Sequence, residues 1–451
     1  MNVTPGRIAP DRPLEIAVIG SGISGLSAAW LLASRHHVTL YEADRRIGGH
    51  SHTVDASGTP VDTGFIVYNE ATYPNLTALF AHLRVPTKPA DMSFAVSLDG
   101  GRLEYSGNGL RGLLAQRRNA LNPRFWSMLR DLVRFYREAP AEIAGIGEES
   151  LGDYLDARGY GAAFRDDHLY PMAAAIWSTP SARIGAYPAA AFIRFCENHG
   201  LLQLTRRPIW RTVDGGSRAY VERLLADQTL RVVRGNPVRW VQRVDGRVAL
   251  GDGASGCRWF DHVVIATHAD QALKLLADPT PEERRLLGVF TYTRNLAVLH
   301  RDPGLMPQRR AAWAAWNYLA AGTAADRRLS VTYWMNALQG IPADQPLFVT
   351  LNPLRPPRDA DILRTDLYEH PTFDTAAMAA QQHLWSLQGV KSTWFCGAYF
   401  GAGFHEDGLQ AGLAVAEGLG GVRRPWRVAQ ESGRIAVATP VAPPADLEFV
   451  A

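Results

Sequence analysis

Cysteine and lysine are both scarce in this sequence. The three cysteines, Cys196, Cys257 and Cys396, are far apart and form no CxxC pair. A disulfide framework or a cysteine-based metal site is therefore unexpected, and a reducing compartment such as the cytoplasm fits this usage. Only three of the 47 basic residues are lysines, and we ascribe this bias to codon usage.

Excess charge of one sign and long uninterrupted apolar runs are also lacking. A formal net charge of +3 on 451 residues leaves no electrostatic footprint for nucleic acid. The first 15 residues contain no apolar core of a signal peptide. The longest apolar stretch, Ile16 to Ala33, is interrupted by glycines and serines, which favours strand, turn and helix over a membrane span. We expect a cytoplasmic globular protein, with peripheral contact to the inner membrane face left open.

The N-terminal region has the pattern of a dinucleotide-binding βαβ unit. An apolar strand, Glu15–Gly20, precedes a helix at Leu26–Arg35, and a second strand, His37–Ala43, carries Glu42 near its end. Glycines at this turn allow backbone N–H groups to approach a pyrophosphate, and the acid about twenty residues later accepts hydrogen bonds from ribose. The GxGxxG motif consists of Gly20, Ser21, Gly22, Ile23, Ser24 and Gly25.

A second GxGxxG, Gly107–Gly112, lacks this context. It follows a hairpin-like segment, and no strand ending in an acid comes about twenty residues later. We interpret it as a turn before a helix, so the sequence gives no evidence for a separate NAD(P)H domain.

The rest of the chain alternates short strands with helical, aromatic-rich regions. A hairpin is expected at 51–67, a helix at Tyr73–Leu83, mostly helix over 125–195 and strands over 228–265. The last helix is expected at Gly408–Gly418, and a loose Pro- and Ala-rich tail from Arg423. Nucleotide-binding elements thus occur at the start, middle and end of the chain.

A Gly48-Gly49 pair soon after Glu42, followed by Asp62-Thr63-Gly64-Phe65, resembles the flavin amine oxidase and phytoene desaturase superfamily. The resemblance covers nearly the whole chain, because four later segments match in order: Trp210–Leu224, Pro237–Val241, Asp261–Thr267 and Phe395–Gly412. It implies FAD as cofactor and an α/β fold. That fold is a Rossmann-like FAD-binding domain of the amine oxidase (glutathione reductase-like) type, with an interleaved α+β substrate domain.

The resemblance also implies domain boundaries and cofactor contacts. The FAD-binding domain would comprise residues 14–70, 205–270 and 390–422, the substrate domain 71–204 and 271–389, and the tail 423–451. Gly48, Gly49 and Gly64 would lie along the ribityl-pyrophosphate, and Val238 would touch adenine through its backbone. The other residues expected to bind FAD are Glu42, Ala43, Arg46, His50, Phe65, Ala266, Gly397, Ala398, Asp407, Gly408 and Leu409.

The segment Gly397–Gly412 resembles the part of the family that brings the final helix to the isoalloxazine ring. A helix N-terminus carries roughly +0.5 charge, which stabilises a reduced, anionic flavin and favours hydride acceptance. Glycines permit close approach of the backbone to the ring. We expect Asp407 to be the N-cap of this helix, and Cys396 to be a small core residue rather than a flavin attachment point.

Three departures from the family bear on function. Classical amine oxidases place a lysine near flavin N5, but the matching stretch Tyr292–Pro303 contains none and has Asn295 at about that position. The arginine usual after Gly-Gly is His50, and the glutamate of the C-terminal motif is Ala398. The missing lysine weakens the amine oxidase interpretation. The other two changes imply phosphate and ribityl contacts that differ in detail, with FAD still bound.

Three further segments, 62–76, 171–180 and 403–412, resemble bacterial flavoproteins identified only as NAD/FAD-binding oxidoreductases. These are similar to furan-fatty-acid desaturases and more distantly to polyunsaturated fatty acid isomerases. The resemblance implies desaturation of a methyl-branched fatty-acyl chain, with an amine or amino-acid oxidase and a redox-neutral isomerase as alternatives. The electron acceptor is left open among oxygen, a quinone and a redox protein.

Desaturation of an unactivated C–H requires hydride transfer together with loss of a proton to a base. His405 and Glu406 are the candidate bases, with Tyr399 and Tyr68 as orienting groups; alternatively, His405 closes the turn before the last helix. The aromatic-rich insertions either form core or line a tunnel for an apolar substrate. Five arginines could meet a carboxylate or phospholipid head group, or simply be solvated: Arg117, Arg118, Arg206, Arg207 and Arg211.

Overall fold

The computed structural model describes residues 12–177, 184–198, 200–203, 207–226, 230–253, 256–322 and 328–437. The chain divides into two compact units. Unit 1 comprises Met1–Gly49, Leu224–Thr291 and Ala376–Ala451, and unit 2 comprises His50–Arg223 and Tyr292–Thr375. Arg206, most of the N-terminal segment preceding the first strand, positions 178–180 of one resembling segment and residues 438–451 lie outside the described residues.

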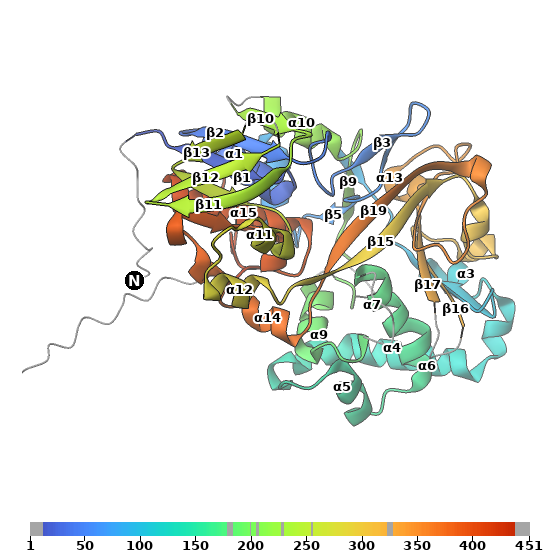
Figure 1. Ribbon diagram of the computed structural model, residues 1–451. Coiled ribbons are helices and arrows are strands. Elements are labelled where there is room, and N and C mark those ends of the chain that lie inside the picture. The colour runs from blue at the N-terminus through green and yellow to red at the C-terminus, as the bar shows by residue number, and fades with distance from the viewer. Residues whose placement is uncertain are drawn as a thin grey trace, which may run out of the picture. The chain divides into compact units, whose positions relative to one another are not determined.

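Unit 1 is built on a five-stranded parallel sheet with strand order β10-β2-β1-β14-β20. Figure 1 labels β10, β2 and β1 of this sheet. Stretches from the start, middle and end of the chain supply these strands, where the sequence analysis placed the nucleotide-binding elements. Their bounds are β1 Glu15–Ile19, β2 His37–Glu42, β10 Arg231–Arg234, β14 His262–Ile265 and β20 Thr393–Phe395. The Rossmann-like fold class is confirmed.

Two helices of unit 1, α1 (Ile23–Ala33) and α15 (His405–Gly420), pack closely against each other. Glycine makes this approach possible, because a Cβ at Gly412 would lie 2.1 Å from the backbone oxygen of Ser24. The helix α15 ends at Gly421, whose φ of 59° suits a left-handed C-cap. Its start at His405 is three residues earlier than the sequence pattern indicated.

A three-stranded antiparallel sheet and two helices complete the middle part of unit 1. The strands are β11 (Val238–Val244), β12 (Arg247–Asp252) and β13 (Gly256–Phe260), and the helices are α11 (Ala269–Leu275) and α12 (Pro281–Leu287). Thr280 and Glu283 form a capping box at the start of α12.

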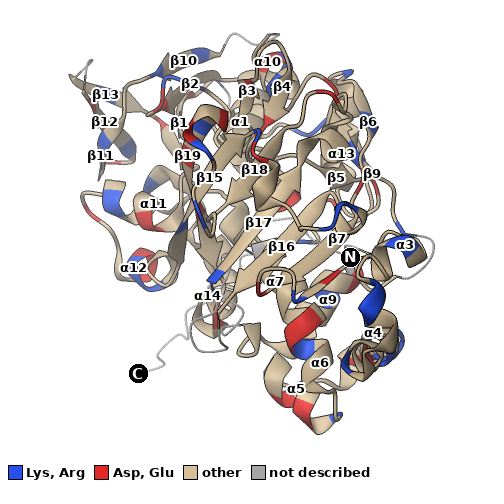
Figure 2. Cartoon of the chain, turned by 90° about the vertical axis from the view of Figure 1, so that its right-hand side faces the viewer, with Lys and Arg blue, Asp and Glu red and all other residues tan. Residues whose placement is uncertain are grey.

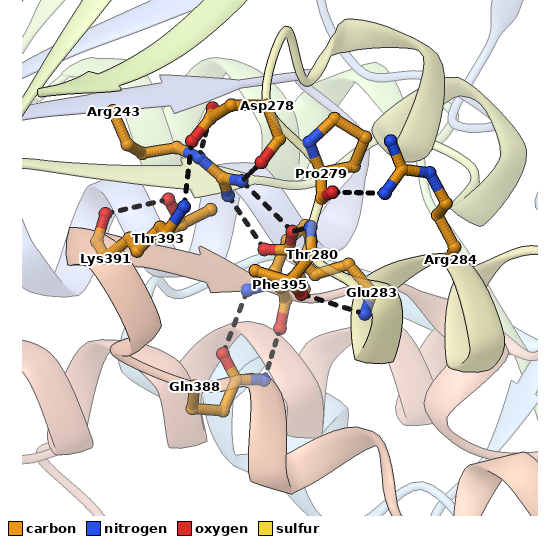
Figure 3. Close-up of polar contacts among 10 residues, drawn as sticks. All are labelled: Arg243, Asp278, Pro279, Thr280, Glu283, Arg284, Gln388, Lys391, Thr393 and Phe395. Carbon is orange, nitrogen blue, oxygen red and sulfur yellow. Dashed lines mark hydrogen bonds and ion pairs between the residues drawn. The ribbon is translucent and has the colours of Figure 1, made fainter.

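An ion-pair cluster ties α12 to β11 (Figure 3). The Arg243 guanidinium, only 2% exposed, donates to both Glu283 carboxylate oxygens at 2.7 and 3.0 Å and to Asp278 at 2.7 Å. The ion pairs of Arg243 attach 271–291 to unit 1, whereas the sequence-based boundary put this stretch in the substrate domain.

The Gln388 side-chain amide caps the outer edge of β20. It donates to the Phe395 carbonyl oxygen and accepts from the Phe395 N–H.

Unit 2 contains a seven-stranded sheet with order β19-β15-β18-β17-β16-β7-β8. The pairing of β16 with β7 is parallel, and the described pairs β15–β18, β18–β17, β17–β16 and β7–β8 are antiparallel. The bounds are β7 Phe94–Leu98, β8 Leu103–Ser106, β15 Thr291–His300, β16 Trp316–Ala321, β17 Arg328–Trp334, β18 Phe348–Leu351 and β19 Ile362–Thr372. In Figure 2, β7, β16 and β17 carry almost no charge, and they contribute to a large hydrophobic core.

Two small sheets in unit 2 account for a second boundary difference. A hairpin joins β3 (Thr53–Asp55) to β4 (Pro60–Asp62), and β5 (Tyr68–Asn69) and β6 (Thr87–Pro89) flank β9 (Trp210–Val213). The buried Asp62 carboxylate accepts hydrogen bonds from Ser217 and Gln339. These pairings place 50–70 and 210–223 in unit 2, although the sequence suggested the FAD-binding domain.

The remaining helices of unit 2 confirm the predicted helical region. Their bounds are α2 Pro74–His82, α3 Gly109–Leu113, α4 Pro123–Glu142, α5 Leu151–Ala157, α6 Ala162–Phe164, the π-helical η3 Arg165–Leu169, α7 Tyr170–Trp177, α9 Ala189–Asn198 and α13 Met335–Gln339. Two more, α10 Arg218–Ala226 and α14 Thr375–Gln381, span unit boundaries in the sequence.

The second GxGxxG lies between strand β8, which pairs with β7 in antiparallel fashion, and helix α3. This confirms the prediction of a turn before a helix. No helix among the described residues is long and apolar enough to cross a membrane.

The described part of the C-terminal tail is not loose. Arg424, whose side chain is 0% exposed, forms a two-point ion pair with Glu417 of α15, with N···O distances of 2.8 and 2.9 Å. Trp426 stacks on Trp30 of α1, with ring centroids 5.9 Å apart. The expectation of a loose tail is therefore wrong for 423–437, because buried ion pairs and an aromatic contact hold it to unit 1.

Candidate cofactor and catalytic site

The glycine-rich loop of unit 1 is crowded on one side and open on the other. Gly20 has a φ of 102°, and a Cβ there would lie 2.7 Å from the Ala266 carbonyl oxygen. A Cβ at Gly25 would lie 1.9 Å from the carbonyl oxygen of Gly20, so neither position tolerates a side chain. By contrast, a Cβ at Gly22 would meet no described atom within 4 Å. The open side of the loop is thus at the start of α1.

The start of α1 fits a pyrophosphate. Gly22 is the N-cap and offers no side-chain oxygen, and the first turn contains no acid. The first intrahelical hydrogen bond runs from Leu26 N to Gly22 O, so the preceding N–H groups have no intrahelical acceptor. These N–H groups and the helix dipole favour an anion at this place.

Glu42 lies at the end of β2, beside the glycine-rich loop. Its carboxylate accepts hydrogen bonds from the Ser21 N–H at 2.9 Å and from the Ser21 hydroxyl, and from the Asp44 N–H at 2.9 Å. The Ser21 hydroxyl in turn accepts from Gly48 N–H at 3.1 Å. This network holds the Glu42 carboxylate at the end of β2, where the sequence pattern predicts contact with the ribose. Ala43 is the next residue along the chain.

The Gly48-Gly49 segment lies against the same loop. Gly49 has a φ of 56°, and a Cβ there would be 2.8 Å from the Gly22 Cα. Arg46 donates to the Gly49 carbonyl oxygen at 2.8 Å, which holds a guanidinium beside the loop. An open helix start, a ribose-side acid and a nearby arginine form a cradle that fits the diphosphate of FAD.

The C-terminal segment predicted to bind FAD meets α1 at this loop. A Cβ at Gly408 would lie 2.8 Å from Ser24 Oγ, 3.0 Å from Ile23 Cγ2 and 3.7 Å from Ala398 N. Leu409 is fully buried, and a Cβ at Gly397 would collide with the Tyr399 ring. The structure thus brings Gly408 and Ala398 to the first turn of α1. Val238 is buried at the start of β11, and its contact with adenine stays a prediction.

The predicted cofactor residues of unit 2 also lie together. Phe65 N–H donates to the His50 carbonyl oxygen at 2.7 Å, and a Cβ at Gly64 would be 2.1 Å from that oxygen. Tyr68 is 2% exposed, and its ring packs edge-on against Phe80 with centroids 5.2 Å apart. Tyr68 therefore has the surroundings of a core residue, and its orienting role stays a prediction.

The candidate bases lie in the first turn of α15. His405 is its first residue, so it does not close a turn ahead of the helix. Burial lowers the pKa of His405 to about 3, so its imidazole is neutral near pH 7. Glu406 is fully buried and accepts a hydrogen bond from Gln410 Nε2 at 2.9 Å. The Tyr399 ring packs against Phe290, with centroids 5.3 Å apart.

The prediction that Asp407 is the N-cap of α15 is wrong. Phe404 occupies that position with extended backbone angles, and Asp407 is the third helical residue. Its carboxylate reaches back to accept the Phe404 N–H at 2.8 Å. Asp407 thus satisfies a free N–H group from inside the first turn, as the acidic member of a capping box does.

Sequence reasoning identified Asn295 but missed its partners in unit 2. The Leu296 N–H donates to Asn352 Oδ1 at 2.9 Å, and the Asn352 amide donates to Asn295 Oδ1 at 2.8 Å. The Asn295 amide therefore faces His370 Nδ1, 3.1 Å away, with its NH₂ group. Because the Leu296 backbone N–H can only donate, it fixes which group donates and which accepts in each of these successive hydrogen bonds. His370 accepts at Nδ1, and its neutral ring carries the proton on Nε2.

The strand β19 contributes two more polar residues near His370. Asp366, Tyr368 and His370 alternate along the strand and so share one face. The His50 ring packs against those of Tyr368 and His370, with centroid distances of 5.3 and 5.7 Å. His52 Nδ1 lies 2.9 Å from the Tyr368 hydroxyl. The period-two spacing of these polar residues is the signal that could have revealed them.

The arginines considered as head-group ligands have mixed surroundings. Arg211 donates to the Thr87 hydroxyl at 3.0 Å and lies 3.5 Å from Glu70. Arg118 and Arg207 donate to backbone carbonyl oxygens, and Arg117 is exposed. Their contact with a substrate stays a prediction.

Comparison with known proteins identifies the family. The family described as "Flavin containing amine oxidoreductase" matches residues 23–301. The chain belongs to this family. Coproporphyrinogen III oxidase of Mycobacterium tuberculosis (strain ATCC 25618 / H37Rv) is 25% identical over 314 residues, which cover 65% of this chain and 67% of that protein.

Several solved structures share the fold of this chain. Cyclohexylamine oxidase from Brevibacterium oxydans IH-35A has a TM-score of 0.62 at 16% identity, covering 90% of this chain and 99% of that one. A CLA-producing fatty acid isomerase from P. acnes has a TM-score of 0.61 at 15% identity, covering 90% of this chain and 97% of that one. The protein is an FAD-dependent oxidoreductase of the amine oxidase family, and FAD as cofactor is confirmed.

Proposed function

We propose that this oxidoreductase desaturates a fatty-acyl chain of a lipid, with a methyl-branched chain as the preferred substrate. The observation that carries the proposal is the amide network at Asn295. Asn295 is 1% exposed, and its amide contacts Asn352 and His370 where amine oxidases have a lysine. The three lysines of the chain form ion pairs elsewhere, Lys88 with Asp214, Lys274 with Asp270 and Lys391 with Asp278.

The apolar character of unit 2 supports a hydrophobic substrate. Partly buried apolar side chains pack against its hydrophobic core cluster, among them Met92, Phe94, Leu113, Leu114 and Trp316. The strands β7 and β16 contain no charged residue, as Figure 2 illustrates. Burial of an acyl chain against such side chains is favourable by about 25 cal/mol for each Å² of apolar surface removed from water. A charged ammonium group gains nothing from the same contacts. A fatty acid isomerase has the same fold, which supports the proposal of an acyl-chain substrate.

Desaturation removes a hydride and a proton from adjacent carbons, and bound FAD supplies the two-electron acceptor. The cofactor would be held by the glycine-rich loop, Glu42 and the Gly48-Gly49 segment. Of the two candidate bases, we propose Glu406 as the proton acceptor. His405 fits this role less well, because a group with a pKa of about 3 binds a proton weakly near neutral pH.

Anaerobic reduction of the bound flavin tests the substrate class. The holoenzyme is mixed without oxygen with a phospholipid carrying methyl-branched acyl chains, and the loss of flavin absorbance is followed. We expect bleaching and one new double bond in the recovered lipid. Cyclohexylamine and coproporphyrinogen III are the comparison substrates, and bleaching by either of them but not by the lipid would refute the proposal.

Two further outcomes refine the test. Unbleached flavin together with a shifted double bond in an unsaturated fatty acid would indicate an isomerase instead. Glu406→Gln should slow bleaching by the lipid at least about a hundredfold while FAD stays bound, since general bases contribute roughly 10²–10⁴-fold. An unchanged rate would exclude Glu406 as the base.

A further inference from the structure

The C-terminal segment 422–437 is fixed to α15 at two points. Near the end of the helix Arg424 pairs with Glu417. Near its start the Arg434 guanidinium bonds both Asp407 carboxylate oxygens, from Nε at 2.6 Å and from a terminal nitrogen at 3.2 Å. The Arg434 N–H also donates to Gln410 Oε1 at 3.1 Å. The segment thus places one arginine at the first turn of α15.

Two buried acids make this arginine important. Glu406 and Asp407 are both 0% exposed and follow one another in the first turn of α15. A helix N-terminus favours one nearby acid by up to about 2 kcal/mol, but this does not offset burial of two carboxylates. Arg434, whose side chain is 19% exposed, supplies the opposite charge to Asp407. Removing it would leave a buried carboxylate with no described ion-pair partner.

The same turn lies next to the phosphate-binding loop. Gly408, which follows Asp407, approaches Ser24 and Ile23 so closely that a Cβ would lie 2.8 and 3.0 Å from their side chains. Ser24 and Ile23 form the first turn of α1, where the diphosphate of FAD would bind. An unpaired carboxylate here would repel that diphosphate, and the low dielectric of a buried site strengthens the repulsion.

We infer that Arg434 is a positioning residue for the cofactor. It neutralises Asp407 and so preserves the positive potential that the N-terminus of α15 presents to FAD. The C-terminal segment is therefore part of the cofactor apparatus, although Arg434 itself lies outside every FAD motif of the sequence. This inference depends on FAD binding and is independent of the proposed lipid substrate.

A double-mutant cycle on the apoprotein, in which each variant neutralises one charge, tests the inference. FAD titration of Arg434→Gln should give a Kd raised about tenfold, since one unpaired charge is added near the diphosphate. Asp407→Asn alone should lower the Kd, because the Arg434 charge is then no longer neutralised near the diphosphate, while the amide oxygen can still accept the Phe404 N–H. The double variant should recover to within about threefold of wild type. Arg427→Gln, which changes an exposed arginine of the same segment, is the matched control.

Two measurements separate this role from a purely structural one. The midpoint potential of the bound flavin should fall in Arg434→Gln and return in the double variant, because a nearby negative charge disfavours reduction. Arg434→Lys keeps the charge and should bind FAD better than Arg434→Gln. If the double variant binds as weakly as Arg434→Gln, or if Arg434→Gln matches Arg427→Gln, the inference is wrong.

Discussion

The polar contacts of the cofactor loop differ from those of one buried network in unit 2 in the distance that they span along the chain. In the loop of unit 1, Ser21 bonds Glu42 and Gly48, which are 21 and 27 positions away. In unit 2 two buried pairs are far longer, with 316 positions between His52 and Tyr368 and 277 between Asp62 and Gln339. A local arrangement leaves a motif in the sequence, whereas a remote one does not.

Buried carboxylates show a second difference. Glu283 in unit 1 accepts from Arg243 and from the Thr280 N–H. Glu104 in unit 2 is fully buried and accepts from Arg309, but also from Ser97 and from two backbone N–H groups. The unit 1 acid therefore depends more on its arginine than the unit 2 acid does.

The largest expected effect tests this dependence directly. Arg243→Met should lower the free energy of unfolding by about 3–5 kcal/mol, because it leaves Glu283 charged, buried and poorly solvated. Arg309→Met should cost only about 1 kcal/mol, since three other donors still bond Glu104. Chemical denaturation of both variants measures the two losses. Equal losses would show that the arginine matters equally in the two units.

Gly25→Ala should cost about 3 kcal/mol, because its Cβ would meet the backbone oxygen of Gly20 at 1.9 Å. Gly22→Ala is the control on the same loop, where the new Cβ meets no described atom and φ is −64°. It should leave apoprotein stability within about 0.5 kcal/mol while weakening FAD binding. Thermal unfolding and FAD titration distinguish them. Unchanged FAD affinity in Gly22→Ala would place the diphosphate elsewhere.

In unit 2, burial lowers the pKa of His168 to about 4, with hydroxyls of Tyr105 and Tyr136 each 3.0 Å from a ring nitrogen. The folded ring stays neutral while the unfolded one, with a pKa near 6.5, takes up a proton. The contribution of the buried neutral His168 ring to the free energy of unfolding is therefore present above about pH 6.5 and is lost as the pH falls to about 4. The loss is up to about 3 kcal/mol.

His168→Gln should flatten this part of the stability curve, as measured by urea unfolding at pH 4 to 7. The buried Asp62, whose pKa burial raises to about 6, acts in the opposite direction. Its contribution is present below about pH 3.8 and is lost as the pH rises through 6. Asp62→Asn in the same background isolates the histidine. A curve of unchanged slope in His168→Gln would contradict the assignment.

The smallest expected effect concerns the amide network. Asn295→Asp replaces the donor facing His370 Nδ1 with an oxygen, so the imidazole should move its proton to Nδ1. The stability change should be about 1 kcal/mol, and ring ¹⁵N shifts of His370 measure the tautomer. Asn295→Gln, which keeps an amide, is the control. If wild-type His370 already carries its proton on Nδ1, the assigned network is wrong.

The sequence predicted some elements better than others for identifiable reasons. The strands and glycines of the first βαβ unit were recognised because each follows a local steric rule. The start of α15 was placed three residues late, because Asp407 resembles an N-cap but caps from within the helix. The stretch 271–291 falls in unit 1, which differs from the sequence-based boundary, and its attachment there includes the ion pair of Glu283 with Arg243, 40 positions earlier.

By itself the sequence determined the Rossmann-like class, the FAD loop and the absence of a lysine at the Asn295 position. The fold class and the glycine-rich loop follow from short-range geometry, since a glycine turn or a strand-end acid works through its immediate neighbours. The choice of FAD and the missing lysine follow from the resemblance to the family. Only the tertiary structure decided that Arg434 faces Asp407 and that His370 accepts a hydrogen bond from Asn295. Such pairs depend on where whole strands and helices pack, and no local pattern encodes that placement.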